Sequence, residues 1–127
     1  MPIAMTVKVV DASALAALLF AEPEADAVEA RLRDAILVAP RLIEYELGNA
    51  CWKKCRRYPD SATALTANFA LLQDLDLQLK DVDPAAVLEL ARRLEITYYD
   101  SSYLWLARTL TAELVTLDAR LLSVIHA

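Results

Sequence analysis

The stretch TVKVVDASALAALLF, residues 6–20, decides the fold. Its first part, Thr6–Val10, is β-branched and mostly apolar, which predicts a buried strand. Asp11 or Ser13 then offers a capping oxygen to a helix over residues 14–20, and Glu22-Pro23 ends that helix. A strand that passes directly into a helix is typical of an α/β protein.

The rest of the chain continues this alternation. Further helices are predicted at about residues 25–32, 42–58, 60–75, 84–94, 100–110 and 119–122, and further strands at 36–39, 75–79 and 114–116. Pro40 and Pro59 stop the elements before them, and Asp83-Pro84 is a cap followed by a first-turn proline. Strands that alternate with helices indicate a parallel sheet, so the sequence predicts an α/β fold.

Length and composition restrict the class of protein. The chain has 127 residues, of which 57% are hydrophobic, and this size predicts one domain spanning residues 1–127 with a core of its own. No apolar run approaches the roughly 20 residues that a membrane-spanning helix needs. The first ten residues contain Lys8 and lack the pattern of a signal peptide, so we expect a cytoplasmic protein that has no membrane partner.

The few cysteine and histidine residues restrict the chemistry. Cys51, Cys55 and His126 are too few for a typical zinc site or for a hydrolase that needs a histidine base. We therefore expect any metal ion to be held by oxygen ligands. Cys51 and Cys55 stand four residues apart on a predicted helix, where core or helix-interface thiols are favoured over a metal pair or a disulfide.

Three aspartates stand where predicted strands end or predicted helices begin. Asp11 and Asp118 each follow a strand, and Asp100 opens a helix. The carboxyl ends of parallel strands share one edge of a sheet, and ligands bind at that edge. Aspartate is also a preferred N-cap, so capping alone would explain each of the three equally well.

A fourth acid caps nothing. It lies within LIEYELGN, residues 42–49, where Glu44 and Glu46 compete for a role in the site. At about 100° per residue the two side chains stand about 200° apart on the helix and cannot face the same place. Periodicity does not choose between them, and both could equally be surface acids.

Four motifs, taken together, resemble the PIN-domain nucleases, in particular the VapC-type toxin ribonucleases. They are VVDASAL at 9–15, Pro40 followed by ELGNA at 46–50, YDSSY at 99–103 and LVTLDARL at 114–121. The resemblance spans nearly the whole chain in the right order. It implies a three-layer α/β/α PIN-like domain with a central parallel sheet of four to five strands.

The resemblance also implies a Mg²⁺- or Mn²⁺-dependent endoribonuclease and assigns its site. It selects Glu46 over Glu44, because the family's glutamate precedes an aliphatic-small-Asn sequence. The implied acid cluster is Asp11, Glu46, Asp100 and Asp118, with Asp11, Asp100 and Asp118 as metal ligands and Ser13, Asn49 and Thr116 in support. Ser101-Ser102 departs from the family pattern, where alanine or a further acid is more common.

Contacts to RNA and to partners are less sharply indicated. The net charge of −5 argues against binding nucleic acid by electrostatics alone. Basic residues could contact phosphates or could simply form a solvated helix end; they are Arg41, Lys53, Lys54, Arg56 and Arg57. The aromatic residues around Asp100 could line a groove or belong to the core. The high apolar fraction suggests buried surface beyond one small core, and the resemblance to the family then implies a homodimer and a cognate antitoxin.

Two other functions are compatible with parts of the pattern. An aspartyl-phosphate phosphotransfer domain also places an aspartate at a strand end, but the sequence after Asp11 lacks a second aspartate two residues on. A catalytically silent PIN-like scaffold in an RNA-processing complex would use the same acids only as caps.

Overall fold

A four-stranded sheet of order β3-β2-β1-β4 forms the centre of the computed structural model, which describes residues 5–127. The strands are β1 (Thr6–Val10), β2 (Ala35–Pro40), β3 (Leu77–Lys80) and β4 (Glu113–Val115), and all neighbouring pairs are parallel. Val9 of β1 lies between Val38 of β2 and Leu114 of β4. The predicted parallel sheet is therefore confirmed, with four strands.

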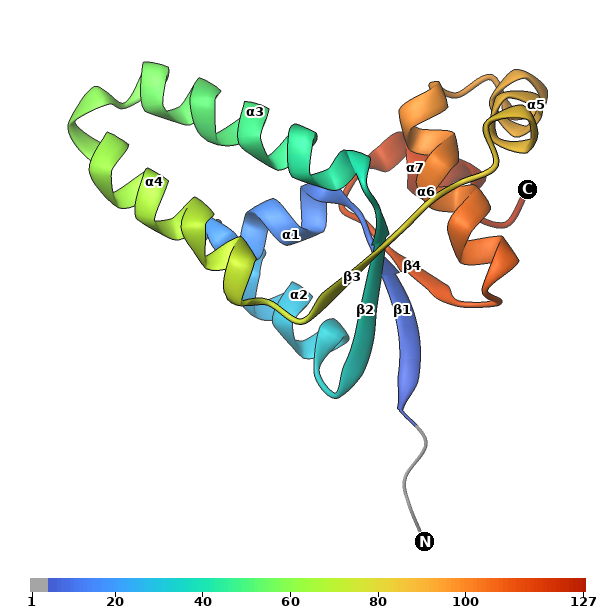
Figure 1. Ribbon diagram of the computed structural model, residues 1–127, viewed down its shortest axis with the longest axis horizontal. Coiled ribbons are helices and arrows are strands. Elements are labelled where there is room, and N and C mark those ends of the chain that lie inside the picture. Colours follow the sequence, from blue (N-terminus) through green and yellow to red (C-terminus); the bar gives the residue numbers. More distant parts are fainter. Residues whose placement is uncertain (1–4) are drawn as a thin grey trace, which may run out of the picture.

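Helices cover both faces of this sheet. Figure 1 shows the sheet edge-on, with α1 to α4 on one side and α5 to α7 on the other. The helices are α1 (Ala12–Leu19), α2 (Ala25–Leu32), α3 (Leu42–Arg57), α4 (Ala62–Ala70), α5 (Pro84–Leu94), α6 (Tyr98–Thr109) and α7 (Ala119–Val124). The three-layer α/β/α arrangement is thus confirmed. None of the helices in residues 5–127 has both the length and the apolar character required to cross a bilayer.

The buried core fixes the strands that carry the candidate site. Val9, Val10 and Val115 have no exposed surface, and Leu104 of α6 is 1% exposed. Helix α6 contacts β1, β2 and β4, so it is the helix that closes this face of the sheet. The burial of apolar side chains between α6 and the sheet therefore holds the carboxyl ends of β1 and β4 in place.

Two predicted boundaries are wrong by a few residues for local reasons. Helix α6 begins at Tyr98 and not at Asp100, because the side chain of Thr97 accepts a hydrogen bond from the Asp100 backbone N–H at 3.0 Å and caps the helix. The predicted helix at 60–75 is divided into α4 and two 3₁₀ turns, Pro59–Ser61 and Leu71–Asp74, so β3 begins at Leu77 and not at residue 75. Asp100 is therefore free of any capping role.

The packing of α6 on the sheet makes a direct prediction. We expect Leu104→Ala to lower the free energy of unfolding by about 2–5 kcal/mol, because it removes a buried side chain and leaves a cavity. Leu88→Ala on α5, where the side chain is 52% exposed, is the matched control and should change the stability by no more than about 0.5 kcal/mol. Denaturant unfolding measures both, and equal effects of the two substitutions would contradict this account of the core.

Candidate active site

Asp11 lies at the point where β1 ends, buried and held by three donors. It is 4% exposed and caps α1. Its Oδ1 accepts hydrogen bonds from the Ala14 backbone N–H at 3.0 Å and from the Ser13 hydroxyl at 2.7 Å, and its Oδ2 accepts one from the Thr116 hydroxyl at 2.5 Å. Both carboxylate oxygens are therefore fixed in direction.

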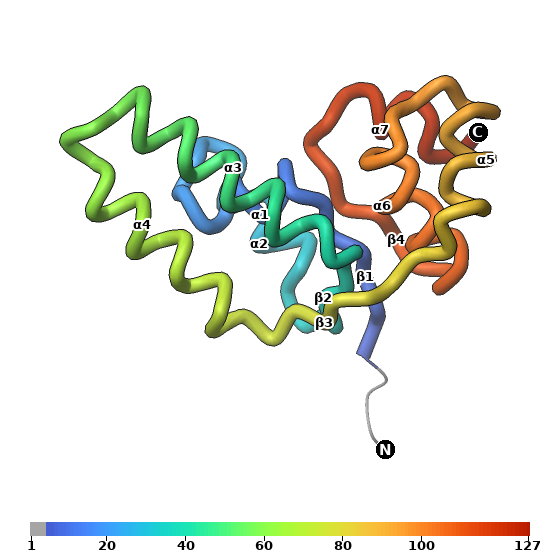
Figure 2. The backbone as a smooth tube through the Cα atoms, turned by 45° about the horizontal axis from the view of Figure 1, so that its top comes forward, coloured from blue at the N-terminus to red at the C-terminus, as the bar shows by residue number. Residues whose placement is uncertain are grey.

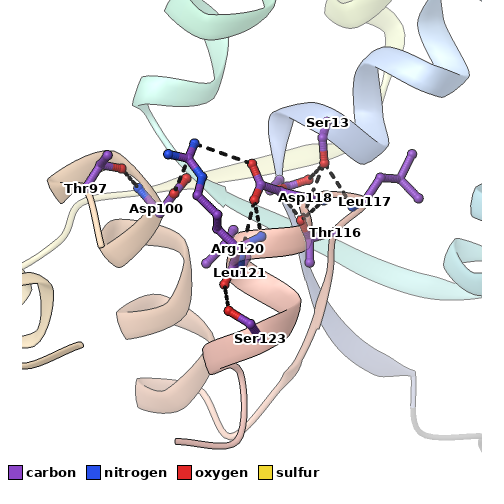
Figure 3. Close-up of polar contacts among 10 residues, drawn as sticks. Ser13, Thr97, Asp100, Thr116, Leu117, Asp118, Arg120, Leu121 and Ser123 are labelled. Carbon is purple, nitrogen blue, oxygen red and sulfur yellow. Dashed lines mark hydrogen bonds and ion pairs between the residues drawn. The ribbon is translucent and has the colours of Figure 1, made fainter. Parts of the chain in front are cut away.

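Two hydroxyl groups join the end of β1 to the segment after β4. The oxygen of Thr116, which donates to Asp11, accepts from the Asp118 backbone N–H at 3.0 Å. The oxygen of Ser13 likewise accepts from the Leu117 backbone N–H at 2.9 Å. Figure 3 shows these contacts side by side. Ser13 and Thr116, predicted as supporting residues, therefore lie where they connect Asp11 to Asp118.

Asp118 caps α7 with one oxygen only. Its Oδ1 accepts from the backbone N–H groups of Arg120 at 2.8 Å and Leu121 at 3.2 Å. Its Oδ2 makes no hydrogen bond within residues 5–127 and faces the guanidinium of Arg120. The cap and the free oxygen are thus separate functions of one side chain.

Asp100 stands on the first turn of α6, opposite Asp118. Its Oδ2 is buried and has no hydrogen-bond partner in the described part of the chain. The Arg120 Nη2 lies 3.9 Å from this oxygen and 3.9 Å from the Asp118 Oδ2, so the two carboxylates face one cation (Figure 3). A buried carboxylate oxygen without a donor is costly, and it identifies a position that suits a cation.

The structure separates the two candidate glutamates. Glu46 is half-buried, and its Oε1 accepts a hydrogen bond at 2.5 Å from the hydroxyl of Tyr103, which is 2% exposed. Glu44 is exposed on another side of α3. Glu46 is thus the glutamate that faces the α6 side of the molecule, where Asp100 lies.

Burial raises the pKa of three of these acids. Loss of hydration is the main cause of the raised pKa of Asp11, Glu46 and Asp100. Nearby negative charge adds to it: Asp118 acts on Asp11 and on Asp100, while Asp11 and Asp100 act on Glu46. Asp11, Glu46 and Asp100 are therefore each close enough to another acid of the set for its charge to raise their pKa.

The acids share one edge of the sheet without forming a finished ligand set. Within residues 5–127 no three Asp, Glu, His or Cys side chains already stand at mutual positions that would hold a metal ion. Asp118 directs one oxygen to its helix cap, and Arg120 lies between Asp118 and Asp100. Small side-chain movements would be needed before a cation could be shared.

The other predicted residues lie on α3 or at its start. Asn49 is exposed on α3, and Arg41 at the end of β2 donates from its Nε to Asp81 at 2.7 Å. Lys53, Lys54, Arg56 and Arg57 occupy the far end of α3, on the long α3–α4 hairpin that extends from the body in Figure 2. At about 1.5 Å per residue, Arg57 lies roughly 16 Å along the helix from Glu46.

The two cysteines lie in the same hairpin, as interface thiols. Both are free. The Cys51 Sγ is 3.6 Å from the Leu65 carbonyl oxygen, and the Cys55 Sγ is 3.9 Å from that of Ala62, at the start of α4. Both thiols therefore lie at the interface of α3 and α4, the position expected of helix-interface thiols.

Sequence reasoning missed the roles of Tyr103 and Arg120. Tyr103 belongs to the aromatic residues around Asp100 that could line a groove or belong to the core. It is a core residue, and its hydroxyl also donates to Glu46, which was not expected. Its position three residues after Asp100, on the same face of α6, was the available signal. Arg120 follows Asp118 by two residues on the first turn of α7, and that spacing was the only hint of its contact with the acids.

The raised pKa of Glu46 predicts a pH-dependent difference between wild type and Glu46→Gln. A carboxyl whose pKa is higher in the folded state binds its proton more tightly there, so its contribution to stability is lost as pH rises above its ordinary 4.5 through the raised value. Glutamine keeps the acceptor for Tyr103 without a charge. Without added metal, we expect Glu46→Gln to gain stability relative to wild type between about pH 4.5 and neutrality.

Thermal or denaturant unfolding across this pH range measures the difference. Glu44→Gln, at an exposed position, is the matched control and should leave the pH profile of wild type unchanged. A pH-independent difference between wild type and Glu46→Gln would contradict the burial of this charge.

Comparison with known proteins agrees with this geometry. The PIN domain family model matches residues 8–126. Ribonuclease VapC3 of Pyrobaculum aerophilum is 35% identical over 121 residues, which cover 89% of this chain and 90% of that protein. The crystal structure of PAE2754 from Pyrobaculum aerophilum superposes with a TM-score of 0.75 at 30% identity, covering 93% of this chain and 84% of the other. The chain therefore belongs to the PIN-domain family and is of the VapC type.

Proposed function

We propose that this protein is a VapC-like toxin that cleaves RNA phosphodiester bonds as a Mg²⁺- or Mn²⁺-dependent endoribonuclease. The observation that supports the proposal best is the unpartnered, buried Oδ2 of Asp100, which faces the free Oδ2 of Asp118 across Arg120. The relationship to a protein named ribonuclease VapC3 supports the choice of RNA as substrate.

Asp11, Asp100 and Asp118 would hold the cation. Hard divalent ions prefer oxygen ligands, and Mg²⁺ takes a few carboxylates together with water and substrate phosphate oxygens. When bound, such an ion would lower the pKa of a water molecule and offset negative charge on the phosphate. The donor set fits, because Asp100 and Asp118 each keep an oxygen that no hydrogen bond uses in residues 5–127.

The surrounding residues would orient the acids and move the proton. Thr116 and Ser13 hold the two oxygens of Asp11 in fixed directions, and Tyr103 holds Oε1 of Glu46. The Oε2 of Glu46 then remains to accept a proton from the attacking water, for which a raised carboxyl pKa is suitable. Glu46 would thus act as the general base, and the three aspartates as ligands.

The basic end of the α3–α4 hairpin would bind RNA away from the scissile bond. Within residues 5–127, Lys54 pairs with Glu22 at 3.7 Å and Arg41 with Asp81, whereas Lys53, Arg56 and Arg57 belong to no ion pair. The Arg56 guanidinium lies over the ring of Trp52, 5.1 Å from its centre, and the indole is 55% exposed. Free cations beside an exposed aromatic ring suit a single-stranded backbone and its bases.

Partner proteins follow from the same proposal. A VapC-type toxin requires a cognate antitoxin, and exposed apolar side chains on α3 offer a surface for it or for a second copy of the chain. Tyr45 is 82% exposed and Trp52 55% exposed. A homodimer bound to antitoxin would cover such side chains.

An aspartyl-phosphate mechanism at Asp11 is not supported. The carboxylate is 4% exposed, and both of its oxygens accept hydrogen bonds from neighbouring groups. A nucleophilic oxygen would have to lose these donors before it could attack phosphorus. The remaining alternative is the catalytically silent scaffold. RNA cleavage and Mn²⁺-dependent stability distinguish it from the nuclease.

Activity should depend on the aspartates and on the metal ion. We expect Asp100→Asn and Asp11→Asn to lower Mg²⁺- or Mn²⁺-dependent cleavage of single-stranded RNA by about 100-fold or more, because each removes a charge from the site. Glu44→Gln, one helical face away from Glu46, should keep wild-type activity. Cleavage that persists in a chelator, or full activity of either aspartate variant with the fold intact, would refute the proposal.

Metal binding should also be visible without RNA. Mn²⁺ at about 100 times its Kd should stabilise the folded protein by roughly 2.7 kcal/mol, which raises the midpoint of thermal unfolding. Asp118→Asn should lose this response but still fold, because asparagine is an equally good N-cap for α7. No shift for wild type at millimolar Mn²⁺ would favour the silent scaffold.

A further inference from the structure

Arg120 is the cation that faces the acid cluster from within the chain. Among the ion pairs of residues 5–127, Arg120 supplies the partner of both Asp100 and Asp118. Its Nη2 is equally far, 3.9 Å, from the Oδ2 of each. One guanidinium equally far from two carboxylates offsets part of the charge of both, and here one of the two oxygens has no other partner.

The residue is fixed at its base and free at its tip. Its backbone N–H donates to Asp118 Oδ1 at 2.8 Å, and its carbonyl accepts from the Ser123 hydroxyl at 2.6 Å. The side chain is 72% exposed, and at 3.9 Å its contacts with the two acids are ion pairs and not hydrogen bonds. The guanidinium can therefore move by rotation of its side chain while its Cα stays beside Asp118.

A divalent ion and this guanidinium compete for the same two oxygens. An ion shared by Asp100 and Asp118 would repel a positive charge located between them. The favourable interaction of Arg120 with the two carboxylates is lost when the ion binds, so Arg120 lowers the affinity for the ion. By the same free energy, the bound ion weakens the interaction of Arg120 with the carboxylates. Loss of Arg120 should accordingly strengthen ion binding.

The displaced side chain has a place to go. An open hollow of about 440 Å³ lies beside the acids, lined by Arg120 together with Asp100, Thr97 and Ser123. That volume lies in the range of pockets that bind small molecules. A guanidinium at its edge presents a planar pair of donors suited to two phosphate oxygens.

We propose that Arg120 is an exchangeable counter-ion: it partly offsets the charges of Asp100 and Asp118 before the metal ion binds, gives way to the ion, and then binds a phosphate of the RNA beside the acid cluster. This role rests on the proposed nuclease function and deepens it, because it assigns a positioning residue that acts on ion and substrate in opposite directions. Removal of a merely structural residue would weaken both metal-ion binding and RNA binding.

The first test is ion affinity. We expect Arg120→Ala to bind Mn²⁺ about three- to fivefold more tightly than wild type in calorimetric titration or thermal shift, as expected for the loss of competing exposed ion pairs. The matched control is Arg33→Ala, which removes another exposed arginine paired to a carboxylate, that of Glu29 at 2.6 Å, at the opposite edge of the sheet. The control should bind Mn²⁺ as wild type does.

The second test is RNA affinity in the presence of Mn²⁺. In a Glu46→Gln background, which blocks cleavage, adding Arg120→Ala should weaken binding of a single-stranded RNA oligonucleotide about three- to tenfold. The slope of log K against log salt should fall by about 0.7, the value for one phosphate contact on a single strand. Arg33→Ala in the same background should change neither quantity.

The outcomes separate the two proposals. Unchanged or weaker Mn²⁺ binding by Arg120→Ala, or an unchanged salt slope, overturns the counter-ion role while the nuclease proposal stands. Wild-type protein that shows no saturable Mn²⁺ binding overturns both. Tighter Mn²⁺ binding together with weaker RNA binding is the result expected only of an exchangeable counter-ion.

Discussion

The hydrogen bond from Thr116 to the buried carboxylate of Asp11 is the contact on which the candidate site depends. It joins the end of β1 to the segment that follows β4, two parts of the chain separated by about a hundred residues. The same hydroxyl oxygen accepts from the backbone of Asp118, so one side chain sets the positions of two acids. Parallel pairing of β1 with β4 is what brings the two strand ends together, and the buried valines around them make that pairing rigid.

Concentrating negative charge at this edge destabilises the fold locally. Burial and mutual repulsion raise the pKa of Asp11, Glu46 and Asp100, which means that their ionised forms are less stable here than in water. The chain compensates with hydroxyl and backbone donors at Asp11, a tyrosine hydroxyl at Glu46 and a single guanidinium at Asp100 and Asp118. Three acids are thus oriented by short hydrogen bonds or a helix cap, while Asp100 depends mainly on a mobile cation.

Much of the architecture was predictable because each step relied on local chemistry. The β-branched run before Asp11 and the Asp83-Pro84 pair define a strand and a helix without knowledge of the rest of the chain. The start of α6 could not be predicted, because Thr97 and Asp100 are both acceptable caps. Only the folded backbone shows that the threonine caps the helix. The sequence pattern could not choose between Glu44 and Glu46 for a related reason. Helical periodicity predicts which face of α3 each glutamate occupies, but Tyr103, the hydrogen-bond partner of Glu46, comes from another helix.

Sequence spacing only hints at the roles of Tyr103 and Arg120, because each role depends on a distance across the fold. A tyrosine in an apolar helix pattern is most often a core residue, and Tyr103 is also that; its additional function lies in one hydroxyl that meets Glu46 from 57 positions away. Arg120 belongs to a short exposed helix where arginine is ordinary. Only the position of Asp100 gives the guanidinium two carboxylates to face.

One guanidinium against four carboxylates leaves the cluster negative. In the proposed function, protons, Arg120 and a metal ion would compete for this excess negative charge. The raised pKa of Asp11 and Asp100 means that these carboxyl groups hold protons more readily than usual. Without a metal ion, protons and Arg120 both reduce the negative charge of the cluster. A metal ion at the proposed site would have to displace these competitors, so an unopposed set of carboxylates would bind it more tightly. Arg120 offsets part of the repulsion between Asp100 and Asp118, which still raises the pKa of Asp100. In the proposed function, the site would thus exchange a weakly held internal cation, the Arg120 guanidinium, for a more strongly held metal ion.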